Sequence, residues 1–216
     1  MGSLMFQEPA ALRLDWGVAL QAQPGQSECG DAWAVEPVPD GFLLAVVDGL
    51  GHGAAAARAS RRAVEIIRSL ASKPLETIFG ACHKALLGSR GAAISAARIN
   101  TSGLSLMWLS VGNVEGLVIN RATGHPPERQ RETLLERGGV VGYELPTLRP
   151  ATISFEPGAV LVLATDGVRH GFALDVRTEL EAQPAADHIL ARYGRGTDDA
   201  LVMVARLLRG GRDQDS

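Results

Sequence analysis

The sequence predicts an α+β fold built from antiparallel sheets covered by helices. Apolar segments follow the order strands, two adjacent helices, several strands, one helix and a final strand, which is not the strand and helix alternation of a parallel dinucleotide fold. Many of these segments have strand length and are separated by short runs of turn formers. With 216 residues and 46% hydrophobic content, the chain can bury a core without disulfides. We expect one domain over residues 1–216, with its core at about 12–207.

The first third of the chain predicts three strands and two helices. Residues 12–20 and 32–38 are apolar or alternating, and the turn formers of 24–30 between them predict a hairpin. A third strand, 42–47, ends in the run Asp48-Gly49-Leu50-Gly51-His52-Gly53. Helical spacing of apolar residues then predicts a helix over 54–70, and Pro74 opens a second one to about 87.

The remaining elements are mostly strands. Residues 92–120 hold three apolar stretches cut by turn formers, which predicts a meander, and 121–132 reads as an exposed loop. Residues 152–155 and 159–165 flank Glu156-Pro157-Gly158 as a further hairpin. A helix over 185–192 and a buried strand over 200–207 complete the order.

Charge and cysteine content limit the function classes. The net charge is -3 with no run of like charges, so neither nucleic acid nor a membrane surface is an expected partner. No signal peptide or apolar run of spanning length is recognised. Cys29 and Cys82 form no metal or disulfide pattern, and cytoplasm is therefore the expected compartment. The sequence leaves the oligomeric state unspecified.

Four aspartates form the candidate site. Asp31 follows a glycine at the start of an expected strand, Asp48 and Asp166 each precede a glycine at the end of one, and Asp198 precedes the last strand. Carboxylates at strand ends can converge at one sheet edge, and their hard oxygens suit Mg²⁺ or Mn²⁺. Asp-Gly is also a common turn pair, and any one of these positions alone is more simply explained as a turn.

The surrounding motifs carry a family resemblance. The segments Val46-Val47-Asp48-Gly49-Leu50-Gly51-His52-Gly53, Gly30-Asp31, Ser110-Val111-Gly112-Asn113, Ala164-Thr165-Asp166-Gly167 and Thr197-Asp198-Asp199-Ala200 together resemble the SpoIIE-type bacterial branch of the metal-dependent type 2C (PPM) serine/threonine phosphatases. The resemblance covers about residues 12–207. With Trp16-Gly17-Val18-Ala19 so near the start, no appended sensor domain is expected, as in a stand-alone stressosome phosphatase. The fold it implies is an αββα sandwich of two antiparallel sheets flanked by helix pairs.

The resemblance also implies a mechanism. Asp48 would bridge two divalent cations, Mn²⁺ or Mg²⁺, with the Gly49 carbonyl on the first, Asp166 and Asp198 on the second, and Asp31 on a water of the first. The two cations would activate a bridging water for attack on phosphoserine or phosphothreonine, without a phosphoenzyme. The implied substrate is a phosphorylated STAS-domain protein of a stress-response or sigma-factor switch. Two alternatives stay open: a non-catalytic binding module of the same fold, and a small-molecule phosphoesterase.

Some features depart from the better-known relatives. Leu50 stands where those carry histidine, and no phosphate-binding arginine is found near the N-terminus. His52 could be a helix-start residue or a proton donor and is not included in the catalytic set. His83, His125, His170 and His188 lack ligand spacing, and Cys29 reads as a bystander thiol. The helices after Asp48 could be a switch or simply a packed layer.

Overall fold

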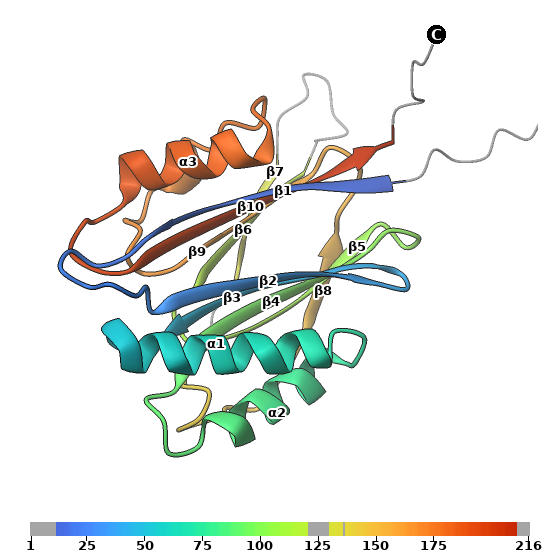
Figure 1. The fold of residues 1–216 in the computed structure, drawn as a ribbon. Coiled ribbons are helices and arrows are strands. Elements are labelled where there is room, and N and C mark those ends of the chain that lie inside the picture. Colours follow the sequence, from blue (N-terminus) through green and yellow to red (C-terminus); the bar gives the residue numbers. More distant parts are fainter. Residues whose placement is uncertain (1–11, 121–129, 136, 211–216) are drawn as a thin grey trace, which may run out of the picture.

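Two stacked antiparallel sheets form the centre of the protein (Figure 1). The computed structural model describes residues 12–120, 130–135 and 137–210. The first sheet has the order β1 (Leu12–Gln21), β10 (Ala200–Arg209), β9 (Val160–Ala164), β6 (Glu115–Asn120) and β7 (Gln130–Leu134). The second has the order β2 (Asp31–Val38), β3 (Gly41–Gly49), β4 (Ala92–Asn100), β5 (Ser105–Val111) and β8 (Ala151–Ser154).

Helices cover the outer face of each sheet. Helices α1 (Gly53–Ser69) and α2 (Leu75–Leu86) pack on the second sheet, and α3 (Ala182–Tyr193) packs on the first, on the opposite side of the sandwich (Figure 1). The predicted α+β, αββα architecture is confirmed. On the first sheet, the described residues place α3 and the short 3₁₀ turn η1 (Phe172–Leu174) where a helix pair was expected. No helix within the described ranges has the length and apolar character needed to span a bilayer.

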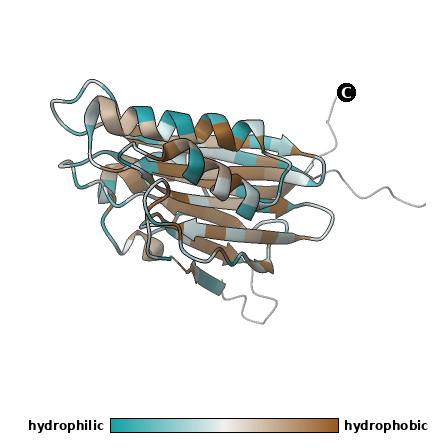
Figure 2. Cartoon of the chain, turned by 90° about the horizontal axis from the view of Figure 1, so that it is seen from below, coloured by the Kyte–Doolittle hydropathy of each residue, from teal (hydrophilic) through white to brown (hydrophobic). Residues whose placement is uncertain are grey.

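Three apolar layers hold the sandwich together. Phe155 and Leu161 belong to the layer between the sheets, Ile67 and Phe79 to the layer under α1 and α2, and Phe172 to the layer under α3. In Figure 2 the strands are mostly brown, whereas the helices mix teal and brown. This pattern is the one expected of sheets buried on both faces and of amphipathic helices covering them.

Two expected hairpins are instead crossings between the sheets, and the expected meander is divided between them. Strands β1 and β2, which flank residues 24–30, belong to different sheets, as do β8 and β9, which flank Glu156-Pro157-Gly158. The expected meander also splits, because β4 pairs with β5 while β6 pairs with β7 and β9. Turn formers reverse the chain but do not select its hydrogen-bonding partner.

The expected loop over 121–132 is wrong at its end. Gln130–Leu134 forms edge strand β7, paired with β6, and residues 121–129 lie outside the described part of the chain. The strand consists mainly of exposed polar residues, so no apolar pattern marked it in the sequence. Edge strands with one solvated face often lack such a pattern.

Candidate functional site

The four predicted aspartates come from strand ends at one end of the sandwich. Asp31 begins β2 and Asp48 lies near the end of β3, and the antiparallel register sets these two residues directly opposite each other. Asp166 follows β9 and Asp198 precedes β10, and these strands are antiparallel neighbours in the other sheet. Each sheet therefore contributes two carboxylates to the same region.

Three of the four line one small pocket. Asp48, Asp166 and Asp198 surround a volume of about 170 Å³, together with Gln23, Leu50, Gly51, His52, Asn113 and Asp199. Asp31 is not in this lining. Its side chain is buried and accepts a hydrogen bond of 2.8 Å from the Thr165 hydroxyl.

Gly49 lies where β3 passes under α1. A Cβ atom here would collide with the backbone carbonyl of Ala56, so only glycine permits this approach. The Gly49 N–H donates to the Gly30 carbonyl at 3.2 Å, and the Leu50 N–H donates to the Gly91 carbonyl at 3.1 Å. The turn that carries Asp48 is therefore held from both sides.

Burial and mutual repulsion raise the pKa values of two carboxylates in the site, Asp31 and Asp48. Burial, followed by the charges of Asp166, Asp198 and Asp199, raises the pKa of Asp48 from 3.8 to about 7. Burial and the charge of Asp48 raise the pKa of Asp31 well above its ordinary value, against the hydrogen bond from Thr165. Such a cluster of repelling carboxylates favours a nearby cation.

The carboxylates of the site are of the type that binds divalent cations, although their oxygens are not close enough together to form a complete metal site. Within the described residues, Asp31, Asp48, Asp166 and Asp198 have no Lys, Arg or His at ion-pair distance. No group of three or more His, Cys, Asp or Glu side chains in that part of the chain is close enough together to hold a metal ion as placed. Hard carboxylate oxygens without a basic partner are the ligands that Mg²⁺ and Mn²⁺ prefer.

Asp199 holds two neighbouring segments of the site together through hydrogen bonds. It is 4% exposed and accepts hydrogen bonds from the Gln23 N–H at 2.8 Å and the Gly30 N–H at 2.9 Å. These bonds fasten the segment between β1 and β2 to the start of β10, and so connect the two sheets beside Asp31.

Two further side chains position the aspartates, and sequence reasoning did not select them. The Asn113 amide donates to Asp166 Oδ2 at 2.8 Å. Thr165 donates to Asp31 and accepts from the Leu201 N–H at 2.8 Å, so one hydroxyl connects β9, β10 and β2. Both residues belong to segments that carried the family resemblance, which was the available signal.

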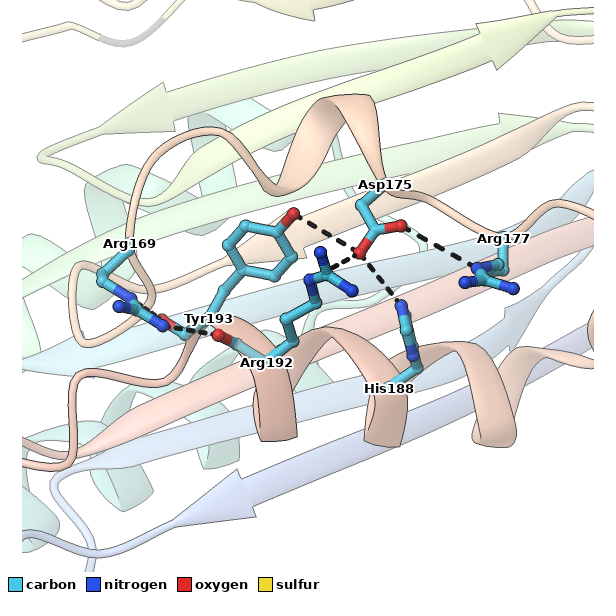
Figure 3. Close-up of polar contacts among 6 residues, drawn as sticks. All are labelled: Arg169, Asp175, Arg177, His188, Arg192 and Tyr193. Carbon is cyan, nitrogen blue, oxygen red and sulfur yellow. Dashed lines mark hydrogen bonds and ion pairs between the residues drawn. The ribbon is translucent and has the colours of Figure 1, made fainter.

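The segment after Asp166 is fastened to α3 by a polar cluster. Asp175 accepts from the Tyr193 hydroxyl at 3.4 Å and lies 3.1 Å from His188 Nε2 and from Arg192 Nε (Figure 3). The hydrogen bond to His188, aided by nearby arginines, lowers the pKa of Asp175. In Figure 3, Arg169 reaches the carbonyls at the end of α3 from the start of the same segment.

The remaining candidates behave as ordinary side chains, except His52. His83 accepts from the Gly142 N–H, and His170 and His188 pair with carboxylates; His125 lies outside the described residues. Burial raises the pKa of the Cys29 thiol to about 12, which fits a bystander. His52 is the N-cap residue of α1 but makes no side-chain capping bond, and it is exposed at the pocket.

Fold and sequence together define a protein phosphatase of the PPM class, a hydrolase. Residues 39–214 match the family of Stage II sporulation protein E (SpoIIE), and the chain belongs to this family. It is 27% identical to the phosphoserine phosphatase RsbX of Bacillus subtilis (strain 168) over 183 residues, which cover 83% of this chain and 87% of that protein. The expected resemblance to the SpoIIE-type branch of the PPM phosphatases is thereby confirmed.

Solved structures of other phosphatases and of a stressosome chain have a fold similar to that of this chain. A chain from work on the bacterial stressosome as a modular system adapted to control secondary messenger signaling is 34% identical, with a TM-score of 0.81 over 90% of this chain and 100% of its own. RsbX in complex with magnesium gives a TM-score of 0.78 at 23% identity over 92% of this chain and 99% of its own. The catalytic domain of PstP with 2 manganese ions gives 0.67 at 17% identity, over 92% and 100%. At these last two identities, the likeness establishes the fold alone.

Proposed function

We propose that the protein hydrolyses phosphoserine or phosphothreonine on a partner protein, a STAS-domain component of a stress-response or sigma-factor switch. The observation that supports this most is the acidic pocket, in which Asp48, Asp166 and Asp198 from both sheets converge without a basic partner among the described residues. Likeness to RsbX, a phosphoserine phosphatase, and to a stressosome chain supports the choice of substrate.

We assign the ligands as the family resemblance implies. Asp48 would help to hold both cations, the Gly49 carbonyl and a water held by Asp31 would serve the first, and Asp166 and Asp198 would serve the second. Two bound cations, Mn²⁺ or Mg²⁺, supply the positive charge that lowers the pKa of water and neutralises the phosphoryl oxygens.

The protein's own side chains set the positions of these ligands. Asn113 fixes the Asp166 carboxylate by its amide bond, and Thr165 fixes Asp31. Asp199 keeps the Gly30 backbone against the start of β10, next to Asp198. Because these bonds restrict rotamers before substrate arrives, less reorganisation is needed during the reaction.

The size of the pocket favours a protein substrate. At about 170 Å³ it is smaller than the roughly 300–1,000 Å³ of typical small-molecule sites. A phosphorylated side chain standing out from a partner protein can enter such a pocket, while the rest of the partner binds outside it. This is the feature that favours the protein phosphatase over the small-molecule phosphoesterase.

The test is phosphate release from a phosphorylated STAS-domain protein and from an aryl phosphate, first in excess EDTA and then with Mn²⁺ or Mg²⁺. We expect no turnover in EDTA, recovery with either cation, and a higher kcat/KM on the protein. Full activity after exhaustive chelation would contradict the two-metal assignment. Equal kcat/KM on both substrates would favour the small-molecule alternative, and binding without phosphate release would indicate a binding module. The two free cysteines fit the cytoplasm as the compartment.

A further inference from the structure

A basic groove lies between α1 and the end of α2 with the loop that follows it, and it reaches toward the acidic pocket. It has a volume of about 570 Å³, and Arg58, Arg62, Arg90 and Ser89 provide its polar lining. Small residues, including Ala55 and Ala59, form much of the rest, and no Asp or Glu of the described ranges lines it. Positions 55, 58, 59 and 62 form one stripe of the helix, because residues three and four apart share a face.

The arginines of this groove differ from the others on α1. Arg61 pairs with Glu28 at 2.7 Å and Arg68 with Glu36 at 3.1 Å, both outside the groove. Within the described chain, Arg58 and Arg90 have no carboxylate at ion-pair distance.

Arg62 also has charge available to an outside partner. Among the residues that the structure describes, it pairs with the exposed Glu65 alone, at 3.0 Å, and an ion pair of this kind contributes little and exchanges readily. The groove therefore offers three guanidinium groups to an outside anion.

The groove reaches the glycine turn of the acidic pocket. Gly51 lines the pocket and has φ of +83°, and a side chain on it would collide with the Arg90 guanidinium. The backbone bond from Leu50 to Gly91 fixes the loop that carries Arg90 against the same turn. Arg90 thus lines the groove and touches the residue where the pocket begins.

We propose that this groove binds an acidic segment of the phosphoprotein substrate, next to its phosphorylated residue, a role that rests on the proposed phosphatase function. Arginine forks pair closely with carboxylates, and charge complementarity of this kind selects and orients a partner. The carboxylates that line the pocket are matched by the proposed cations, which serve the phosphoryl group and not the residues on either side of it. The arginines of the groove offer positive charge to those residues, at the point where the substrate chain would leave the pocket.

Two synthetic peptides test the proposal. Both carry one phosphoserine; one has Glu and Asp on either side of it, and the other has Gln and Asn at the same positions. In Mn²⁺ at low ionic strength, we expect the protein to prefer the acidic peptide by about tenfold in kcat/KM, since several exposed charge pairs act together. The preference should shrink as salt rises toward about 0.5 M, because exposed charges are screened.

Charge reversal identifies the surface. The double variant Arg58→Glu, Arg62→Glu should lose the preference, and Arg90→Gln should reduce it. The matched control is Arg13→Glu, an exposed arginine on β1 that is not in the groove. The readout is a ratio from one sample, so a partly unfolded fraction affects both peptides equally.

The outcomes separate the two claims. If the wild-type protein turns over both peptides equally, or if Arg13→Glu loses the preference as fully as the double variant does, the groove proposal is wrong and the phosphatase function stands. If neither peptide nor the phosphorylated protein is turned over with Mn²⁺ or Mg²⁺, the proposed function fails and takes the groove's role with it.

Discussion

Asp48→Asn should make the metal-free protein more stable while removing its activity. The carboxylate of Asp48 is buried among Asp166, Asp198 and Asp199, and these surroundings raise its pKa from 3.8 to about 7. At alkaline pH the folded protein must hold this charge against its neighbours. The asparagine variant keeps the shape of the side chain and carries no charge to repel.

The size and sign of the effect follow from that pKa. One pKa unit corresponds to about 1.4 kcal/mol, so the shift allows at most about 4 kcal/mol. Between about pH 4 and pH 7 the folded state keeps a proton that the unfolded state has lost. The free energy of unfolding of the wild-type protein therefore falls as pH rises through this window. We expect the variant to be more stable than wild type by about 2–4 kcal/mol at pH 8 and by little near pH 4.

Urea unfolding in EDTA at several pH values measures this difference. The control is Asp40→Asn in the exposed turn between β2 and β3, which should show no comparable pH-dependent gain. Added Mn²⁺ should stabilise the wild type by about 2.7 kcal/mol at a hundred times the dissociation constant, and should stabilise Asp48→Asn much less. A gain that is absent at pH 8, or that is equal at pH 4 and pH 8, would refute the reasoning.

Three further predictions concern the same site. Asp166→Asn should lower turnover by about a hundredfold or more, because it removes charge that helps to stabilise the transition state, and near wild-type kcat would show that the ligand assignment is wrong. Thr165→Val should destabilise the protein by about 2 kcal/mol in urea unfolding, because the Leu201 N–H and Asp31 lose a buried partner, and an unchanged midpoint would contradict this. A phosphorylated partner protein should lower the Mn²⁺ concentration for half-maximal turnover relative to a short phosphopeptide from it at matched saturation, because coupling between two ligands is reciprocal. If turnover depends on Mn²⁺ concentration identically for the partner protein and the peptide, α1 and α2 act as a packed layer and not as a switch.

The elements were predictable where the pattern was local. The apolar run that ends at Asp48, the glycine turn and the helix after it needed only neighbouring residues to be recognised, and β3 and α1 follow them closely. Strand pairing was not predictable in this way. The turn formers of 24–30 were consistent with a hairpin, yet β1 pairs with β10 from the far end of the chain. Pairing depends on which apolar faces can be buried together, which no short window contains.

The site shows the same division. Asp31, Asp48, Asp166 and Asp198 could be selected because each lies in a short motif beside an expected strand, and these motifs together resemble one phosphatase family. Their supports could not, since the bond from Thr165 to Asp31 spans 134 residues and the bond from Asn113 to Asp166 spans 53. The residue types of the candidate site could be recognised from short motifs, whereas the contacts that position them could be recognised only in the folded structure.

The helices after Asp48 were described as either a packed layer or a switch, and the contacts suggest that these roles are compatible. Ile67 and Phe79 bury the inner faces of α1 and α2 against the second sheet, so the pair is a structural layer. Helix α1 begins at Gly53, and Gly49 lies so close to the Ala56 carbonyl that not even a Cβ atom would fit between them, so the turn that carries Asp48 packs directly against α1. Tightly packed interfaces shift between discrete arrangements more readily than they deform gradually. We therefore expect a partner bound across the outer face of α1 to shift the turn that carries Asp48, which is the basis of the predicted change in the Mn²⁺ concentration for half-maximal turnover.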